Sequence, residues 1–203
     1  MTTRSQILQR GTPLARALAE AQFAELHSRV IDAPPEQVWS VLHTLKWSEL
    51  PLTRLLMTVR LAGRGDLERR LVEPPSPAAP ILEEPPHLLT SGMIGKPWEP
   101  KPVQGPAVES LQQLCDFDAP GWLKYGMEML LVPLSGGRTL VETATICEAT
   151  DVRARRRFGA YWSLIRVFSG VVRRDMLAGI QRKCARPGRN RTVTSVGSAA
   201  IGR

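Results

Sequence analysis

The segment from residue 122 to residue 184 most constrains the fold of this chain. Residues 122–134 and 138–150 have the composition of strands, and Ser135-Gly136-Gly137 separates them. Glycine adopts positive φ without a side-chain clash, so this tripeptide predicts a tight hairpin turn. The next residues repeat apolar side chains every three or four positions, which predicts one long helix over about 150–184. Its apolar stripe consists of Phe158, Tyr161, Trp162, Ile165, Phe168, Val172, Met176 and Ile180.

Upstream of this hairpin, the chain alternates between strand and helix signals in a fixed order. Residues 22–33 alternate as a strand does, and Pro34 and Pro35 end that pattern. Helical spacing follows in residues 35–45 and again in about 50–61, and short strands are predicted at 81–84 and 87–95. The order of one strand, two helices, several antiparallel strands and a long helix predicts an α+β protein. Its curved antiparallel sheet should wrap around the C-terminal helix, which must bury its apolar stripe.

The chain divides into three parts by composition. Residues 1–21 are predicted to be an N-terminal extension, with a short helix that begins near Pro13. Residues 22–185 are predicted to form the domain, within which residues 108–118 are ambiguous and fit a turn of helix followed by a strand near Cys115 to Phe117. Residues 186–203 are basic and rich in Gly and Ser, without an apolar period, which predicts a disordered tail.

Positive charge is concentrated at the C-terminal end of the chain. The net charge is +8, and residues 151–203 hold 13 Lys or Arg and only 2 acids. Such a segment fits weak contact with an anionic membrane surface, or simply a solvated helix face with a basic tail. No aromatic residues are interleaved with the arginines, which disfavours a nucleic-acid partner.

Several kinds of chemistry lack their sequence signature. No glycine-rich nucleotide-binding loop is present, and the histidines and cysteines have no spacing typical of a metal site or a disulfide framework. We therefore predict no metal and no cofactor. No apolar run is long enough to span a membrane, and the N-terminus is not typical of a signal peptide, which predicts a cytoplasmic protein with reduced thiols. The residues considered are His27, His43, His87, Cys115, Cys147 and Cys184.

Large apolar residues on one face of the strand at 122–134 are the candidates for a ligand-binding wall. Side chains alternate along a strand, so these residues share one face. The alternative interpretation is that they form the core of the domain and line no cavity. The helix at 50–61 has an apolar underside suited to a lid. The polar candidates for the same cavity are Tyr125, Glu142, Thr143 and Tyr161. Alternation puts Glu142 and Thr143 on opposite faces of residues 138–149, and the sequence leaves open which face points inward. The candidate ligand-binding residues are Leu55, Leu56, Val59, Tyr125, Met127, Met129, Leu131, Glu142, Tyr161, Trp162, Ile165 and Phe168.

Several stretches resemble the START-like, or SRPBCC, superfamily. The opening residues from Glu25 to Trp39 contain DAPPEQVW, and the later stretches SELPLTRLLMTVRL, IGKPWEP, FDAPGWLKYGMEMLLVPLSGGRTLVETA and TDVRARRRFGAYWSLIRVFSGVVRRDMLAGI follow in the expected order. This superfamily includes polyketide cyclases, lipid-transfer domains and Bet v 1-like proteins. The chain looks closest to an uncharacterised actinobacterial-type branch of it. The resemblance implies a helix-grip fold with a hydrophobic tunnel between the sheet and the last helix.

The resemblance and the apolar residues together predict a function. We expect the protein to bind, and to transport or sequester, a hydrophobic or amphipathic small molecule such as a lipid or polyketide-like compound. The alternative is an enzyme of the cyclase, dehydratase or hydrolase type, with Glu142 or Tyr125 as the proton carrier. The superfamily has no universal catalytic residue, so the resemblance assigns no catalytic role, and fold alone does not determine function.

Overall fold

A single antiparallel sheet is the framework of the protein. The computed structural model describes residues 3–60, 66–73 and 79–185, without the side chains of residues 57, 59 and 60, so the predicted tail at 186–203 lies outside the described residues. The strands of the sheet run in the order β1-β6-β5-β3-β2, and β4 pairs with the end of β3. They are β1 (Phe23–Ile31), β2 (Leu82–Glu84), β3 (Leu88–Lys96), β4 (Val103–Gln104), β5 (Leu123–Leu134) and β6 (Arg138–Ala149).

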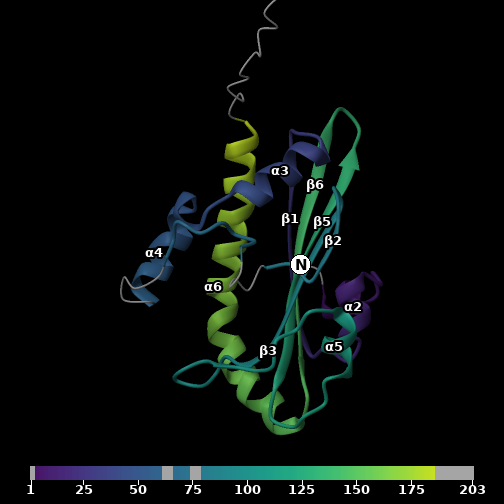
Figure 1. Cartoon of the computed structure of the whole chain (residues 1–203), viewed down its shortest axis with the longest axis vertical. Coiled ribbons are helices and arrows are strands. Elements are labelled where there is room, and N and C mark those ends of the chain that lie inside the picture. The colour runs from purple at the N-terminus through teal and green to yellow at the C-terminus, as the bar shows by residue number, and fades with distance from the viewer. Residues whose placement is uncertain (1–2, 61–65, 74–78, 186–203) are drawn as a thin grey trace, which may run out of the picture.

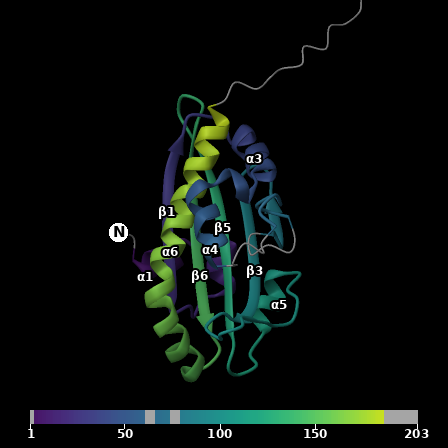
Figure 2. The same ribbon diagram turned by 90° about the vertical axis from the view of Figure 1, so that its left-hand side faces the viewer.

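Helices cover both faces of this sheet. Figure 1 shows α3, α4 and α6 on one side of the strands and α2 and α5 on the other. Seen from the α6 side, the long helix crosses the sheet obliquely, as Figure 2 shows. The predicted α+β class, with a long C-terminal helix packed on an antiparallel sheet and short helices after the first strand, is confirmed. The helices are α1 (Arg4–Leu8), α2 (Pro13–Ala17), α3 (Pro35–Thr44), a 3-10 turn (Trp47–Glu49), α4 (Pro51–Arg60), α5 (Leu111–Asp116) and α6 (Val152–Cys184).

Local sequence rules account for the β5–β6 hairpin and the start of α6. Gly136 and Gly137 adopt φ values of 76° and 68° in the turn, a region that favours glycine. Asp151 caps α6, because its carboxylate accepts the backbone N–H of Ala154 at 2.7 Å. This hydrogen bond satisfies one of the unpaired amides of the first turn, so the chain leaves β6 and enters the helix within a few residues.

Alternation along the strands divides the core into two sides. Odd-numbered residues of β1, β5 and β6 face α6, and in the strand pairing Phe23 lies opposite Cys147, which lies opposite Tyr125. Near the C-terminal end of α6, a large buried cluster joins α3, α6 and the sheet. A second cluster lies near the N-terminal end of α6, around Phe158. The first cluster includes Leu42, Leu45, Met127, Met129, Leu131, Val141, Met176, Leu177 and Ile180.

The N-terminal segment covers the other face of the sheet. Ile7, Leu14 and Leu18 are 2%, 0% and 0% exposed and pack in one cluster with residues of β6 and α5. Residues 3–21 therefore contribute to a core, whereas the sequence offered no role for them. In the ambiguous stretch at 108–118, the strand predicted near Cys115 to Phe117 is wrong, because the helix α5 (Leu111–Asp116) continues through Cys115 and no strand follows it there.

Three glutamates on the even-numbered positions of β5 and β6 hold this segment in place. Glu128 accepts the backbone N–H of Leu14 at 3.0 Å, and Glu148 accepts that of Glu20 at 3.1 Å. Glu142 forms a two-bond ion pair with the guanidinium of Arg10. Charged acceptors make the stronger protein hydrogen bonds, so these contacts add to the apolar packing that holds the N-terminal segment against the sheet.

None of the helices within the described residues is long and apolar enough to cross a membrane.

Candidate functional site

The interface between α6 and the sheet is tightly packed at its two ends and looser between them. At each end of α6, buried apolar side chains meet the sheet, in the clusters around Phe158 and around Met176. Between those clusters, Ile165 and Val172 are only half-buried, and Phe168 is 44% exposed. The middle turns of the helix therefore present apolar side chains that the sheet does not cover.

A polar cluster lies beside this loose region, on the side of the sheet that faces α6. Arg173 of α6 donates from its two Nη atoms to Thr143 Oγ1 at 3.0 Å and to Thr145 Oγ1 at 2.7 Å. On the neighbouring strand β1, Glu25 Oε1 and His27 Nε2 are 2.6 Å apart. These five residues come from β1, β6 and α6, which are far apart in the chain. Of these five, only Thr143 was among the polar candidates from the sequence, because alternation groups Glu25 with His27 but does not show which helix covers that face.

The charges in this cluster are partly buried and incompletely paired. The Glu25 side chain is 10% exposed, and its Oε2 has no hydrogen-bond partner among the described residues. Burial lowers the pKa of Arg173 to about 10, and the negative charge of Glu25 opposes that shift. A buried polar atom without a partner costs about 1–3 kcal/mol, and more when the group is charged. The cluster therefore has unused capacity to accept a hydrogen bond.

Gly170 allows α6 to approach β1 at this point. A β-carbon at residue 170 would lie 3.2 Å from Glu25 Oε1 and 3.5 Å from the His27 ring carbon Cε1. A side chain at this position would crowd the Glu25 carboxylate. A glycine inside a helix costs roughly 1 kcal/mol relative to alanine, and here that cost permits the close contact between helix and polar cluster.

A groove of about 760 Å³ opens next to the polar cluster. It is lined by consecutive residues of β1 from Phe23 to His27, which means that it runs along the strand edge that has no neighbouring strand in the described sheet. Aromatic and aliphatic side chains form much of its wall, Glu25 and His27 form a polar patch, and three arginines line it from α1 and α6. The apolar wall includes Phe23, Leu26, Trp162, Val167 and Val171, and the arginines are Arg4, Arg166 and Arg174.

The structure distributes the predicted ligand-binding residues over several environments. Met127, Met129 and Leu131 are buried in the core cluster near the C-terminal end of α6, and Trp162 alone of the predicted set lines the groove within the described residues. Tyr125 and Tyr161 pack partly buried around Phe158, and burial raises the pKa of the Tyr125 phenol to about 12. On α4, Leu55 is 62% exposed, Leu56 is half-buried, and the side chain of Val59 is outside the described residues.

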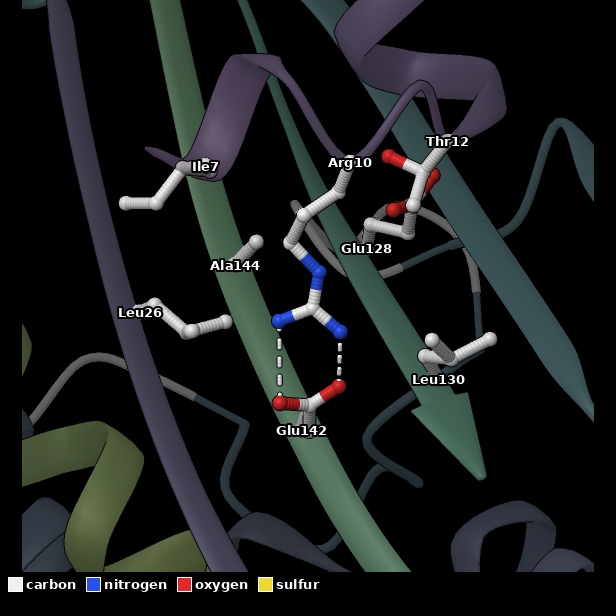
Figure 3. A pocket seen from close by; sticks show the side chains of 8 residues that line it. All are labelled: Ile7, Arg10, Thr12, Leu26, Glu128, Leu130, Glu142 and Ala144. Atoms are coloured by element: carbon white, nitrogen blue, oxygen red, sulfur yellow. Dashed lines mark hydrogen bonds and ion pairs between the residues drawn. The ribbon is translucent and has the colours of Figure 1, made fainter. Parts of the chain in front are cut away.

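Glu142 lies on the opposite face of the sheet from α6. Alternation places it with Leu140 and Ala144, and Arg10 covers it there, as Figure 3 shows. The pocket around this ion pair measures only about 10 Å³, roughly the space for one water molecule. Glu142 and Tyr125, the two predicted proton carriers, therefore lie on different faces and cannot act on the same bound molecule.

Comparison with known proteins gives only distant structural similarity. No family model and no curated protein matches the chain. A Nitrosospira multiformis protein of known structure is 15% identical, with a TM-score of 0.36 over 81% of this chain and 97% of that chain. CalU16 from Micromonospora echinospora is 17% identical, with a TM-score of 0.28 over 79% and 83% of the two chains. A protein from Thermus thermophilus is 13% identical, with a TM-score of 0.28 over 80% and 97%. At such TM-scores these similarities carry no functional argument, and the fold assignment rests on strand order and packing.

Proposed function

We propose that the protein binds a hydrophobic or amphipathic small molecule in the groove between β1 and α6. The observation that carries the proposal is the groove itself, about 760 Å³ with mainly apolar walls and one buried polar patch. Ligand sites typically measure about 300–1,000 Å³ and combine apolar walls with a few placed polar groups. The sequence resemblance to START-like proteins, in which the ligand lies between the sheet and the last helix, supports the same proposal.

The packing of α6 explains how such a site persists without its ligand. Clusters at both ends of the helix fix its position on the sheet, so the middle turns need not collapse onto the strands. Apolar side chains left in water lose about 25 cal/mol for every Å² that could have been buried, and a ligand would cover part of that area. Binding and carriage require no proton-transfer group, in agreement with the separation of Tyr125 from Glu142.

Two residues of α6 offer a matched test of the groove. Val167 lines the groove and Leu164 does not, although they are 69% and 67% exposed on the same helix. An aspartate at either position costs the helix a similar amount of stability, but only Val167→Asp adds a charge to the apolar wall. We expect Val167→Asp to weaken binding of a neutral apolar fluorescent probe about tenfold, because a charge in a ligand site must be desolvated. Leu164→Asp should leave the affinity unchanged.

The measurement is a fluorescence titration of the three proteins, with thermal shift across a panel of lipids and native mass spectrometry of the purified chain. A ligand that binds the folded state raises the unfolding temperature in a concentration-dependent way. Equal weakening by both substitutions would move the site away from the groove. If the unmodified protein binds no probe and shows no thermal shift, the proposed function is wrong.

A further inference from the structure

The hydrogen bonds and the surroundings of Glu25 indicate which chemical class of ligand fits the groove. We infer that the groove selects a neutral apolar molecule with a hydroxyl group, such as an alcohol or phenol, whose O–H donates to Glu25. This inference rests on the proposed function and narrows it to a ligand class. It follows from the hydrogen bonds that Glu25 makes and from the charges that surround it.

The hydrogen bonding of Glu25 requires a donor. Its Oε1 is already in contact with His27 Nε2, whereas Oε2 is buried without a partner among the described residues. An ionised carboxylate only accepts hydrogen bonds, so an ether or ester oxygen cannot satisfy it. Arg173, whose charge interacts with this carboxylate, directs its two Nη atoms to Thr143 and Thr145. A ligand hydroxyl would supply the missing donor.

The charges around Glu25 favour a neutral ligand. A cationic head group would approach Arg173, and the groove is also lined by Arg4, Arg166 and Arg174. An anionic head group would meet the Glu25 carboxylate, whose side chain is only 10% exposed and therefore poorly screened by water. A hydroxyl donates the hydrogen bond without adding charge of either sign.

The apolar wall near this carboxylate suits the rest of such a molecule. Phe23 and Trp162 both line the groove, and their ring centroids are 6.0 Å apart. Phe23 is two positions from Glu25 in β1, so the two side chains point to the same face of the sheet. An alkyl chain or aromatic ring attached to the hydroxyl can therefore lie against the aromatic wall.

A series of probes with the same ten-carbon chain separates the head-group chemistry. The probes are 1-decanol, methyl decyl ether, decanoate and decylamine, each measured by displacement of the neutral fluorescent probe. We expect 1-decanol to bind about tenfold more tightly than the ether, the usual effect of one hydrogen bond to a charged group. Decanoate and decylamine should both bind more weakly than the alcohol.

Glu25→Gln and Glu142→Gln provide the matched pair of variants. Glu25→Gln removes the charge from the groove, and the preference for the alcohol over the ether should fall to less than about threefold. Glu142→Gln makes the same chemical change on the other face of the sheet and should keep the preference intact. Infrared difference spectra of the unmodified protein add a measurement that needs no variant, since 1-decanol should shift the carboxylate stretch and the ether should not.

The outcomes distinguish this inference from the proposed function. If none of the probes binds, both are wrong. If alcohol and ether bind equally, or if decanoate or decylamine binds most tightly, the groove is a ligand site but the inference about its chemistry is overturned. The inference is equally overturned if Glu25→Gln keeps the alcohol preference or the carboxylate stretch does not respond.

Discussion

Removal of the N-terminal segment should destroy the fold, although residues 1–21 precede the first strand. Full burial of an aliphatic side chain stabilises a protein by about 1.5–3 kcal/mol. Ile7, Leu14 and Leu18 are at most 2% exposed, so together they contribute about 5–9 kcal/mol. The whole stability of a domain is about 5–15 kcal/mol. Deletion would also expose Glu128 and Glu148 without their backbone donors.

The assay is chemical denaturation followed by circular dichroism. A chain that begins at residue 22 should lack a cooperative unfolding transition, and Leu14→Ala in the full chain should lower the free energy of unfolding by about 2–5 kcal/mol. Gln9→Ala is the control, because Gln9 is exposed on the same segment. A shortened chain with an unchanged unfolding midpoint would refute the view that this segment is part of the core.

Three further results are expected from single residues. Asp175 accepts the N–H and hydroxyl of Thr53 at 2.8 and 3.1 Å, so Asp175→Ala should accelerate hydrogen exchange in α4 and cost about 1–3 kcal/mol of stability; unchanged exchange would contradict this anchoring role. A thiol reagent should label exposed Cys115 in the native protein and Cys147 only after unfolding, because burial raises the pKa of the Cys147 thiol; mass spectrometry of native and denatured samples checks this. Burial raises the pKa of the Tyr125 phenol from 10.0 to about 12, so its contribution to stability is complete below pH 10.0 and is lost as the pH rises to about 12. Ultraviolet titration should show one tyrosine that ionises only near pH 12, and this step should be absent from Tyr125→Phe.

Local rules were sufficient for the elements that most shape the fold. The apolar period of α6, its Asp151 cap and the glycine turn before β6 depend on neighbours in the sequence, so residue order alone determines them. Local patterns also predicted the order of helices and strands, and that order predicted the α+β class. The bounds of β5 and β6 also lie within a residue or two of those predicted.

The role of residues 3–21 was not readable from the sequence, because the evidence for it lies elsewhere in the chain. Lys124, Glu128 and Glu148 are 6%, 3% and 9% exposed on the face that these residues cover. In a sheet with one solvated face, charged residues at alternate positions mark the outer side. Here helices cover both faces and bury these charges, and the cost of burial is offset because the charges pair with each other and with the N-terminal backbone.

The candidate site depends on the tertiary structure for the same reason. Sequence alternation put Glu25 with His27, and Glu142 with Ala144, and only Glu142 was predicted to line the cavity. Which one lies beside α6 is decided by the pairing of β1 with β6 and by the close approach of Gly170, and neither is encoded within a strand. A strand's own sequence specifies which side chains share a face, whereas the element packed against that face comes from distant parts of the chain.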